Sequence, residues 1–166
     1  MKSSKIPPFC EPAVAPLPDQ TSPPPRILVV DDDGDTRFLT NKVLTDSGYH
    51  VHTAENGAVA WDTIQKTSYD LVITDNNMPK VTGVELLKKL HAARMAVPII
   101  LATGSLPQDE FTRHPWLRPT AVLLKPFDIE DLLDAVKQVL SAAEFVREQA
   151  MTAPDSLSPP PADGLQ

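Results

Sequence analysis

Between residues 26 and 148, five short strand-like stretches, most of them apolar, alternate with five stretches whose apolar residues recur at helical spacing. The strand-like stretches are residues 27–30, 50–54, 70–74, 97–103 and 121–124. The helical stretches are residues 35–47, a segment that Asn56 can cap, residues 83–93, a short segment at 107–114, and residues 128–148. Short apolar strands that alternate with helices favour a parallel sheet covered on both faces. The pattern therefore predicts an α/β domain of the (βα)5 type.

The two ends of the chain differ from this middle part in composition. Eight of the 18 prolines lie in residues 1–25 and four in residues 151–166. Proline lacks a backbone donor and favours extended conformations, so proline-rich segments with few apolar residues do not build a packed core. We expect a disordered tail at 1–25, the folded domain at 26–148 and a second disordered tail at 149–166.

Charge and cysteine content limit the class of protein. The formal net charge is −7, which argues against a nucleic-acid partner, because such partners require a basic face. A single cysteine, Cys10, excludes an intrachain disulfide. Prolines interrupt the apolar residues near the N-terminus, and no apolar run approaches the roughly 20 residues of a membrane span. We expect a cytoplasmic protein with no nucleic-acid and no membrane partner.

Polar side chains stand where the predicted strands end. Asp31 and Asp32 follow the first strand, Asp75 follows the third, Thr103 ends the fourth and Lys125 follows the fifth. In open parallel sheets the ligand site lies beyond the carboxyl ends of the strands, so these side chains should converge. Clustered carboxylates suit Mg²⁺, a carboxylate can attack phosphorus, and a lysine can offset the negative charge. This edge of the sheet is therefore predicted to carry out phosphoryl chemistry.

Four motifs, each at a strand end, carry a family resemblance. The segments "ILVVDDDGDTR", "LVITDNNMPKVTGVELL", "IILATGS" and "LLKPF" resemble the response-regulator receiver domain of two-component signalling over about residues 26–146. The resemblance implies a flavodoxin-like fold with strand order 2-1-3-4-5. It also implies a phosphoacceptor signalling protein, not an enzyme that turns over an external substrate. Because only a short segment follows the last helix, we expect a single-domain response regulator.

The resemblance also implies roles for individual residues. Asp75 would be the phosphoacceptor, Thr103 would bond the phosphoryl group, and Lys125 would pair with it. The implied Mg²⁺ ligands are Asp31, Asp32, Asp75 and the backbone carbonyl of Asn77. A cis peptide is common in the family before the residue that corresponds to Pro126. The donor would be a histidine kinase or phosphotransfer protein, and the output would pass to a downstream protein target.

The sequence departs from the family pattern near the fourth helix. Val122 stands where receivers usually carry an aromatic switch residue, so the ring to which Thr103 would be coupled in the family pattern is missing here. Gly104, the small residue after the threonine, should leave the phosphoryl site open. Three prolines, Pro107, Pro115 and Pro119, preclude a long helix here. We expect an unusual partner-binding face. Trp116 there either contacts a partner or, as we favour, fills the core of a loop.

Other interpretations remain for the acidic residues. Asp33 and Asp35 fit a solvated helix start, and the spacing after Asp31 does not match a calcium-binding EF-hand loop. A haloacid-dehalogenase-type phosphatase also uses a strand-end Asp-x-Asp, but its later acidic pair should end a strand. The third reading is a degenerate receiver that binds its partner without phosphorylation. The four histidines share no ligand spacing and are interpreted as surface or packing residues.

Overall fold

The computed structural model describes residues 23–152. Its strands are β1 (Arg26–Val30), β2 (His50–Ala54), β3 (Leu71–Asp75), β4 (Ile99–Thr103) and β5 (Ala121–Leu124). Its helices are α1 (Gly34–Asp46), α2 (Gly57–Lys66), α3 (Gly83–Ala92), α4 (Gln108–Arg113) and α5 (Ile129–Thr152). All neighbouring strands pair in parallel in the order β2-β1-β3-β4-β5, which confirms the predicted flavodoxin-like (βα)5 fold.

The proposed tails at 1–25 and 149–166 lie mostly outside the described residues. At the C-terminal side, α5 continues to Thr152, so residues 149–152 are helical and extend the last helix beyond its expected end at 148. No helix within 23–152 is long and apolar enough to cross a membrane.

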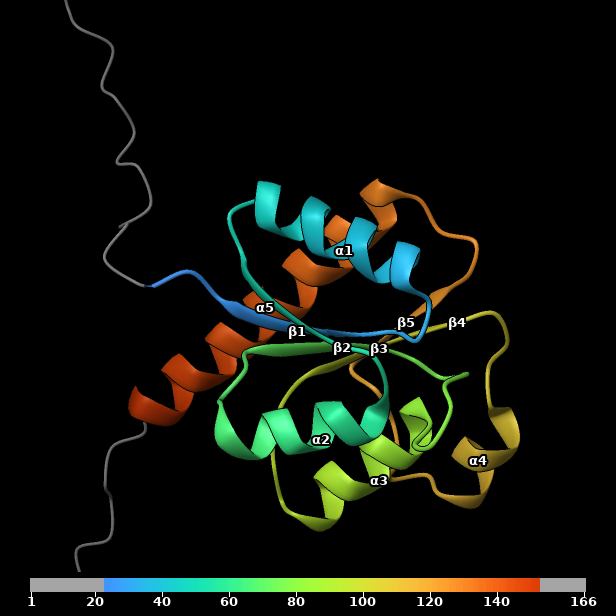
Figure 1. The fold of residues 1–166 in the computed structure, drawn as a ribbon. Helices are drawn as coiled ribbons and strands as arrows, with labels where there is room; N and C mark the ends of the chain where they lie inside the picture. The colour runs from blue at the N-terminus through green and yellow to red at the C-terminus, as the bar shows by residue number, and fades with distance from the viewer. Residues whose placement is uncertain (1–22, 153–166) are drawn as a thin grey trace, which may run out of the picture.

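The sheet lies between two layers of helices, with α1 above it and α2 and α3 below it in Figure 1. Successive strand residues point to opposite faces, so each strand contributes to both layers. Ile27 and Val29 of β1 pack in the cluster formed with α1 and α5, whereas Leu28 and Val30 pack in the cluster formed with α2 and α3. The central strands β1, β3 and β4 are therefore buried on both faces along almost their whole length, which explains why most of their residues are apolar. The edge strands β2 and β5 are partly exposed.

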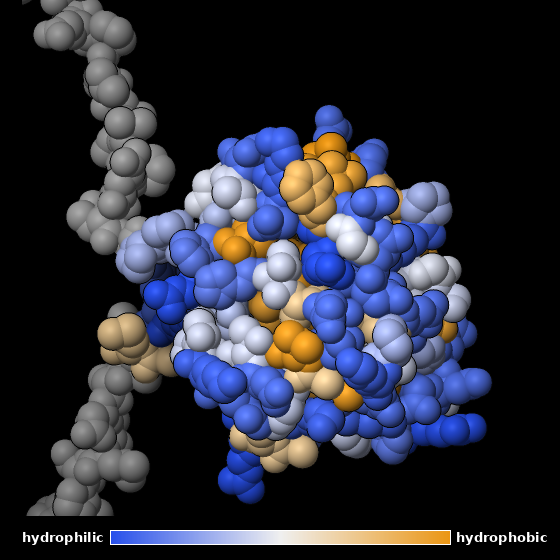
Figure 2. All heavy atoms as spheres, in the orientation of Figure 1, coloured by the Kyte–Doolittle hydropathy of each residue, from blue (hydrophilic) through white to orange (hydrophobic). Residues whose placement is uncertain are grey.

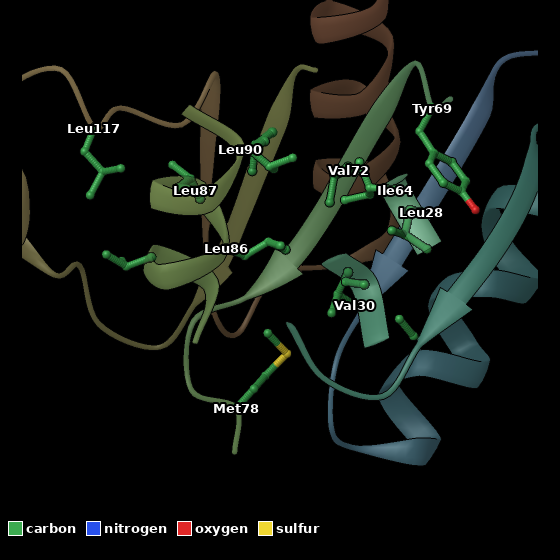
Figure 3. Packing of buried hydrophobic residues seen from close by; sticks show 14 residues of the cluster. Leu28, Val30, Ile64, Tyr69, Val72, Met78, Leu86, Leu87, Leu90 and Leu117 are labelled. Carbon is green, nitrogen blue, oxygen red and sulfur yellow. The ribbon is translucent and has the colours of Figure 1, made fainter. Parts of the chain in front are cut away.

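Figure 3 shows the lower cluster, in which Leu86, Leu87 and Leu90 of α3 face the apolar side chains of the sheet. Leu86 and Val72 are fully buried. Truncation of such a leucine to alanine typically costs about 2–5 kcal/mol, because it removes apolar contacts and leaves a cavity. This packing holds the strands in register and thereby fixes the positions of the residues at their ends.

Local signals set where the helices begin and end. The Asn56 side chain accepts hydrogen bonds from the backbone N–H groups of Ala58 and Val59, both at 3.0 Å, as predicted for a cap. Gly48 ends the α1 segment with φ of +92°, a conformation that suits glycine. Helix α4 is only six residues long, in agreement with the proline-rich sequence around it.

Candidate functional site

Three aspartates meet at the carboxyl edge of the sheet. Asp31 follows β1 and Asp75 ends β3, and these strands are neighbours in which Val30 pairs with Thr74. Parallel pairing therefore brings Asp31 and Asp75 level with each other. Carboxylate oxygens of Asp31, Asp32 and Asp75 lie within 4.8 Å of one another. Asp31 and Asp75 are buried and Asp32 is exposed, so the cluster opens to solvent on one side.

One ammonium group lies between the two buried carboxylates. The Nζ atom of Lys125 is 3.2 Å from Asp31 Oδ2 and 3.3 Å from Asp75 Oδ2. Burial raises the pKa of Asp31, although the hydrogen bond from Asp33 N–H and the charge of Lys125 oppose it. Burial alone would lower the pKa of Lys125, but Asp31 and Asp75 outweigh it and raise that pKa. Among the described residues, Lys125 thus pairs with two of the three carboxylates and forms no ion pair with Asp32, so the site is suited to a further positive charge.

The loop between β1 and α1 holds Asp31 in place. The backbone N–H of Asp33 donates to Asp31 Oδ1 at 2.9 Å, and Arg37 Nη1 donates to the Asp31 carbonyl at 2.6 Å. The Asp33 side chain accepts from the N–H groups of Thr36 and Asp35, which lowers its pKa. Asp33 therefore caps α1, in agreement with the solvated helix start that the sequence predicts at this position. The Arg37 contact was missed, although a cation in the first turn after an acidic strand end is a usable signal.

The loop between β3 and α3 orients Asp75. The backbone N–H of Asn77 donates to Asp75 Oδ1 at 3.3 Å, while the Asn76 side chain accepts from Val84 N–H at 3.2 Å and fixes the start of α3. A Cβ on Gly83 would lie 2.5 Å from the Asp75 carbonyl oxygen, so only glycine allows α3 to begin this close. The roles of Asn76 and Gly83 in this site become visible only in the structure.

Thr103 lies at the same edge but is engaged elsewhere. Asp75 pairs with Ala102, so Thr103 is one residue further along β4, and it is fully buried. Its Oγ1 donates to the carbonyl oxygen of Ser105 at 2.9 Å, within the loop that leads to α4. Val122 on β5 is 36% exposed and provides no ring next to this loop. The hydroxyl therefore contacts the β4–α4 loop in this state.

The structure also bears on the other sequence-based expectations. The Lys125–Pro126 peptide is cis, as the resemblance implies. The phosphatase alternative requires an acidic pair after the lysine that ends a strand, but the acidic residues that follow Lys125, among them Asp128 and Asp131, do not end a strand. They lie at the start of α5, where the N–H of Asp131 donates to Asp128 Oδ1 at 3.0 Å. Trp116 is 50% exposed and does not fill a loop core, because the next residue, Leu117, takes the buried position.

Comparisons with known proteins agree with this geometry. A family model described as the response regulator receiver domain matches residues 27–137. Sporulation initiation phosphotransferase F of Bacillus subtilis is 35% identical over 115 residues, which cover 69% of this chain and 93% of that protein. Response regulator receiver protein CpdR of Brucella abortus is 34% identical over 118 residues, which cover 71% and 98%. The structure of response regulator protein TrrA of Thermotoga maritima in complex with Mg²⁺-BeF gives a TM-score of 0.60 at 32% identity, covering 69% and 98%.

Proposed function

Because this chain belongs to the response-regulator receiver family, we propose that it accepts a phosphoryl group on Asp75 from a phosphohistidine donor. The observation that carries the proposal is the cluster of Asp31, Asp32 and Asp75 around Lys125. We further propose that residues 26–148 act as a single-domain response regulator in the cytoplasm. The protein would then be a phosphoacceptor that signals through other proteins.

The proposed reaction is an in-line displacement at phosphorus. An oxygen of Asp75 forms the new P–O bond while the P–N bond of the phosphohistidine breaks, and the imidazole leaves with the electron pair. The N–H of Asn77 and the ammonium of Lys125 each contact one oxygen of Asp75, so the carboxylate is oriented before the donor arrives. After transfer, Lys125 would offset the charge of the phosphoryl oxygens.

The site also fits Mg²⁺. Buried and exposed carboxylates within 4.8 Å of one another provide the oxygen ligands that this ion prefers, and their single ammonium partner leaves negative charge to be neutralised. Asp31, Asp32, Asp75 and the carbonyl of Asn77 would hold the ion. When bound, it would reduce the repulsion between Asp75 and the incoming phosphoryl group.

The donor would dock on the groove between α1 and the segment that follows β5. This groove has a volume of about 840 Å³, and its lining includes the apolar side chains of Leu39, Phe127 and Ile129 as well as Lys125. Phe38 and Leu39 of α1 are 68% and 55% exposed. Figure 2 shows hydrophobic side chains gathered at the top of the view, over α1. An apolar surface next to the acceptor suits a helical donor that must place its phosphohistidine beside Asp75.

The output would pass through the loop that Thr103 contacts. A phosphoryl group on Asp75 would offer the Thr103 hydroxyl a charged acceptor in place of the Ser105 carbonyl, and charge-assisted hydrogen bonds are stronger. Transfer of this bond would shift the β4–α4 loop and α4 between two populations. Because Val122 carries no ring, the proposed switch works through the loop itself.

The direct test is the intact mass after incubation with acetyl phosphate, with and without Mg²⁺. We expect one Mg²⁺-dependent, base-labile phosphoryl adduct on the wild type and none on Asp75→Asn. Absence of the adduct on the wild type would favour the degenerate receiver. An adduct that persists on Asp75→Asn would show that the acceptor is assigned to the wrong residue.

A second test distinguishes docking of the protein donor from phosphoryl transfer at Asp75. Phe38→Glu places a charge in the proposed docking surface without touching Asp75. We expect phosphorylation by acetyl phosphate to be unchanged, while transfer from histidine kinases of the source organism, autophosphorylated with ATP, becomes slower. Equal losses with both donors would mean that the substitution disturbs the site itself.

A further inference from the structure

An exposed tryptophan stands beside two histidines on the side of the molecule that carries α3 and α4. The Trp116 ring lies 4.4 Å from the ring of His91 at the end of α3, and 5.4 Å from the ring of His114 after α4, measured between centroids. Half of the Trp116 side chain remains exposed, whereas Leu117 is almost fully buried. The buried leucine and the two ring contacts hold Trp116 at the surface in a defined position.

This side of the molecule is basic although the protein is acidic. Residues 83–118, which run from the start of α3 past α4, contain five lysine and arginine residues and three acidic residues, Glu85, Asp109 and Glu110, whereas the whole chain has a net charge of −7. The cations are Lys88, Lys89, Arg94, Arg113 and Arg118. Figure 1 places α4 beside α3 on the lower side of the sheet, and the ion pair of Lys88 with Glu110, at 2.7 Å, joins the two helices. The charges therefore come from two segments that meet in space.

The positive charge is only partly offset within the described part of the chain. Glu110 pairs with Lys88, and the hydrogen bond from Lys88 together with the nearby charges of His114 and Arg113 lowers the Glu110 pKa. Among residues 23–152, no ion pair engages Arg94, Arg113 or Arg118, and all three side chains are exposed.

We propose that the surface formed by His91, Arg94, Arg113, His114, Trp116 and Arg118 binds an acidic segment of another protein. This set is called the Trp116 surface below. Its arginines would pair with carboxylates, and Trp116 would cover an apolar side chain between them, as tryptophan and arginine commonly do at the centre of interfaces. The inference goes beyond the proposed phosphoryl transfer and names a partner chemistry for a face distinct from the α1 groove.

A protein segment fits this surface better than a nucleic acid does. A long polyanion would extend past the Trp116 surface onto a molecule whose overall charge is −7, where repulsion grows with its length. A short acidic peptide meets only the local positive charge. The small extent of the basic region therefore selects a ligand of limited length.

The test uses the full-length protein without a phosphodonor, so its result is separate from the phosphorylation experiments. The probe is a twelve-residue synthetic peptide of four Asp-Leu-Glu repeats, with an Asn-Leu-Gln peptide as the neutral control, added to the ¹⁵N-labelled protein. The protein has two tryptophans, Trp61 and Trp116, and each gives its own indole N–H signal. We expect the acidic peptide to shift the Trp116 signal and the amides of residues 91–94 and 113–118, and the neutral peptide to shift none of them.

Matched substitutions locate the contact. Arg118→Glu and Lys137→Glu change the net charge equally, but Lys137 is exposed on α5, which packs on the other face of the sheet. We expect Arg118→Glu and Trp116→Ala each to weaken peptide binding about tenfold, and Lys137→Glu to change it less than about twofold. Unchanged thermal midpoints would show that the variants are folded.

Three results would overturn the proposal. One is the absence of any shift at millimolar acidic peptide. Another is binding elsewhere on the molecule, shown by shifts outside the Trp116 surface together with an equal loss in Lys137→Glu. The third is tight binding of a single-stranded oligonucleotide such as dT12 through the same residues without binding of the acidic peptide, which would assign the surface to nucleic acid.

Discussion

At the carboxyl edge of the sheet three aspartates lie together and one lysine pairs with two of them, whereas at the amino edge the single carboxylate of Asp70 receives two donors. Asp70 Oδ2 accepts from the backbone N–H of Arg26 at 2.9 Å, and Oδ1 accepts from Arg147 Nη1 at 3.0 Å. These bonds connect the start of β1, the residue before β3 and the C-terminal part of α5. The two edges place the same residue type in opposite electrostatic surroundings.

This difference in surroundings distinguishes an aspartate that stabilises the fold, Asp70, from the aspartates that form the candidate site. At the amino edge, each carboxylate oxygen has a donor, so the charge of Asp70 stabilises the folded state. At the carboxyl edge, three carboxylates lie close to one ammonium group, and burial raises the pKa of Asp31, so ionisation of Asp31 opposes folding. Proteins tolerate such local destabilisation where binding or chemistry requires it. A bound cation should therefore stabilise the folded protein through the carboxyl edge and not through the amino edge.

Among the changes considered, Mg²⁺ binding at the carboxyl edge should have the largest effect on the stability of the protein. Binding to the folded state alone contributes about 2.7 kcal/mol at a free concentration one hundred times the dissociation constant. We expect thermal unfolding of the wild type to shift upward in MgCl₂ relative to chelator. The shift should persist in Asp70→Asn and disappear in Asp31→Asn. A shift of equal size in Asp31→Asn would place the ion away from the carboxyl edge.

Removal of one charge at the carboxyl edge should stabilise the metal-free protein. Asp75→Asn keeps nearly the same shape, relieves repulsion with Asp31 and Asp32, and leaves Lys125 paired with Asp31. We expect urea unfolding in chelator to show a gain of about 1–2 kcal/mol, because charges at this separation interact by a few kcal/mol in a partly buried site. A loss of stability would mean that the pair of Asp75 with Lys125 outweighs the repulsion.

The same substitution at the amino edge should have the opposite sign. Asp70→Asn removes the charge from both hydrogen bonds and leaves only one acceptor oxygen for the two donors, so we expect a loss of about 1 kcal/mol. Chelator and MgCl₂ should give the same loss, since the substitution lies at the edge opposite the proposed ion. Opposite signs for Asp75→Asn and Asp70→Asn, measured side by side in urea, would establish the contrast, and equal signs would remove it.

The two edges also differ in how well the sequence reveals them. Asp31, Asp75 and Lys125 follow runs of strand residues, and parallel strands end at one edge, so their convergence follows from the order of the elements alone. Their individual roles still rest on the family resemblance. The Asp70 contacts leave no such pattern, because Arg147 is 77 residues away and is selected only when α5 packs across the sheet.

Side-chain exposure was the other feature that sequence did not settle. The hydrophobicity of "HPWLRP" does not say which of two adjacent large side chains points inward, and the structure buries Leu117 and exposes Trp116. The length of α5 was underestimated, because the Pro-rich composition beyond residue 150 obscured a helix that continues to Thr152. Both differences concern choices that tertiary packing makes, not local propensity.

The smallest effect should come from Arg147→Ala. The Arg147 side chain is 60% exposed and that of Asp70 is 33% exposed, and ion pairs in such surroundings contribute about 0.5 kcal/mol or less. Because the bond from Arg26 N–H to Asp70 remains, we expect the loss to be confined to faster hydrogen exchange in the last turns of α5, and added salt to reduce the difference from the wild type. If Arg147→Ala lowers the free energy of unfolding as much as Asp70→Asn does, the ion pair with α5, and not the hydrogen bond to β1, accounts for the contribution of Asp70 to stability.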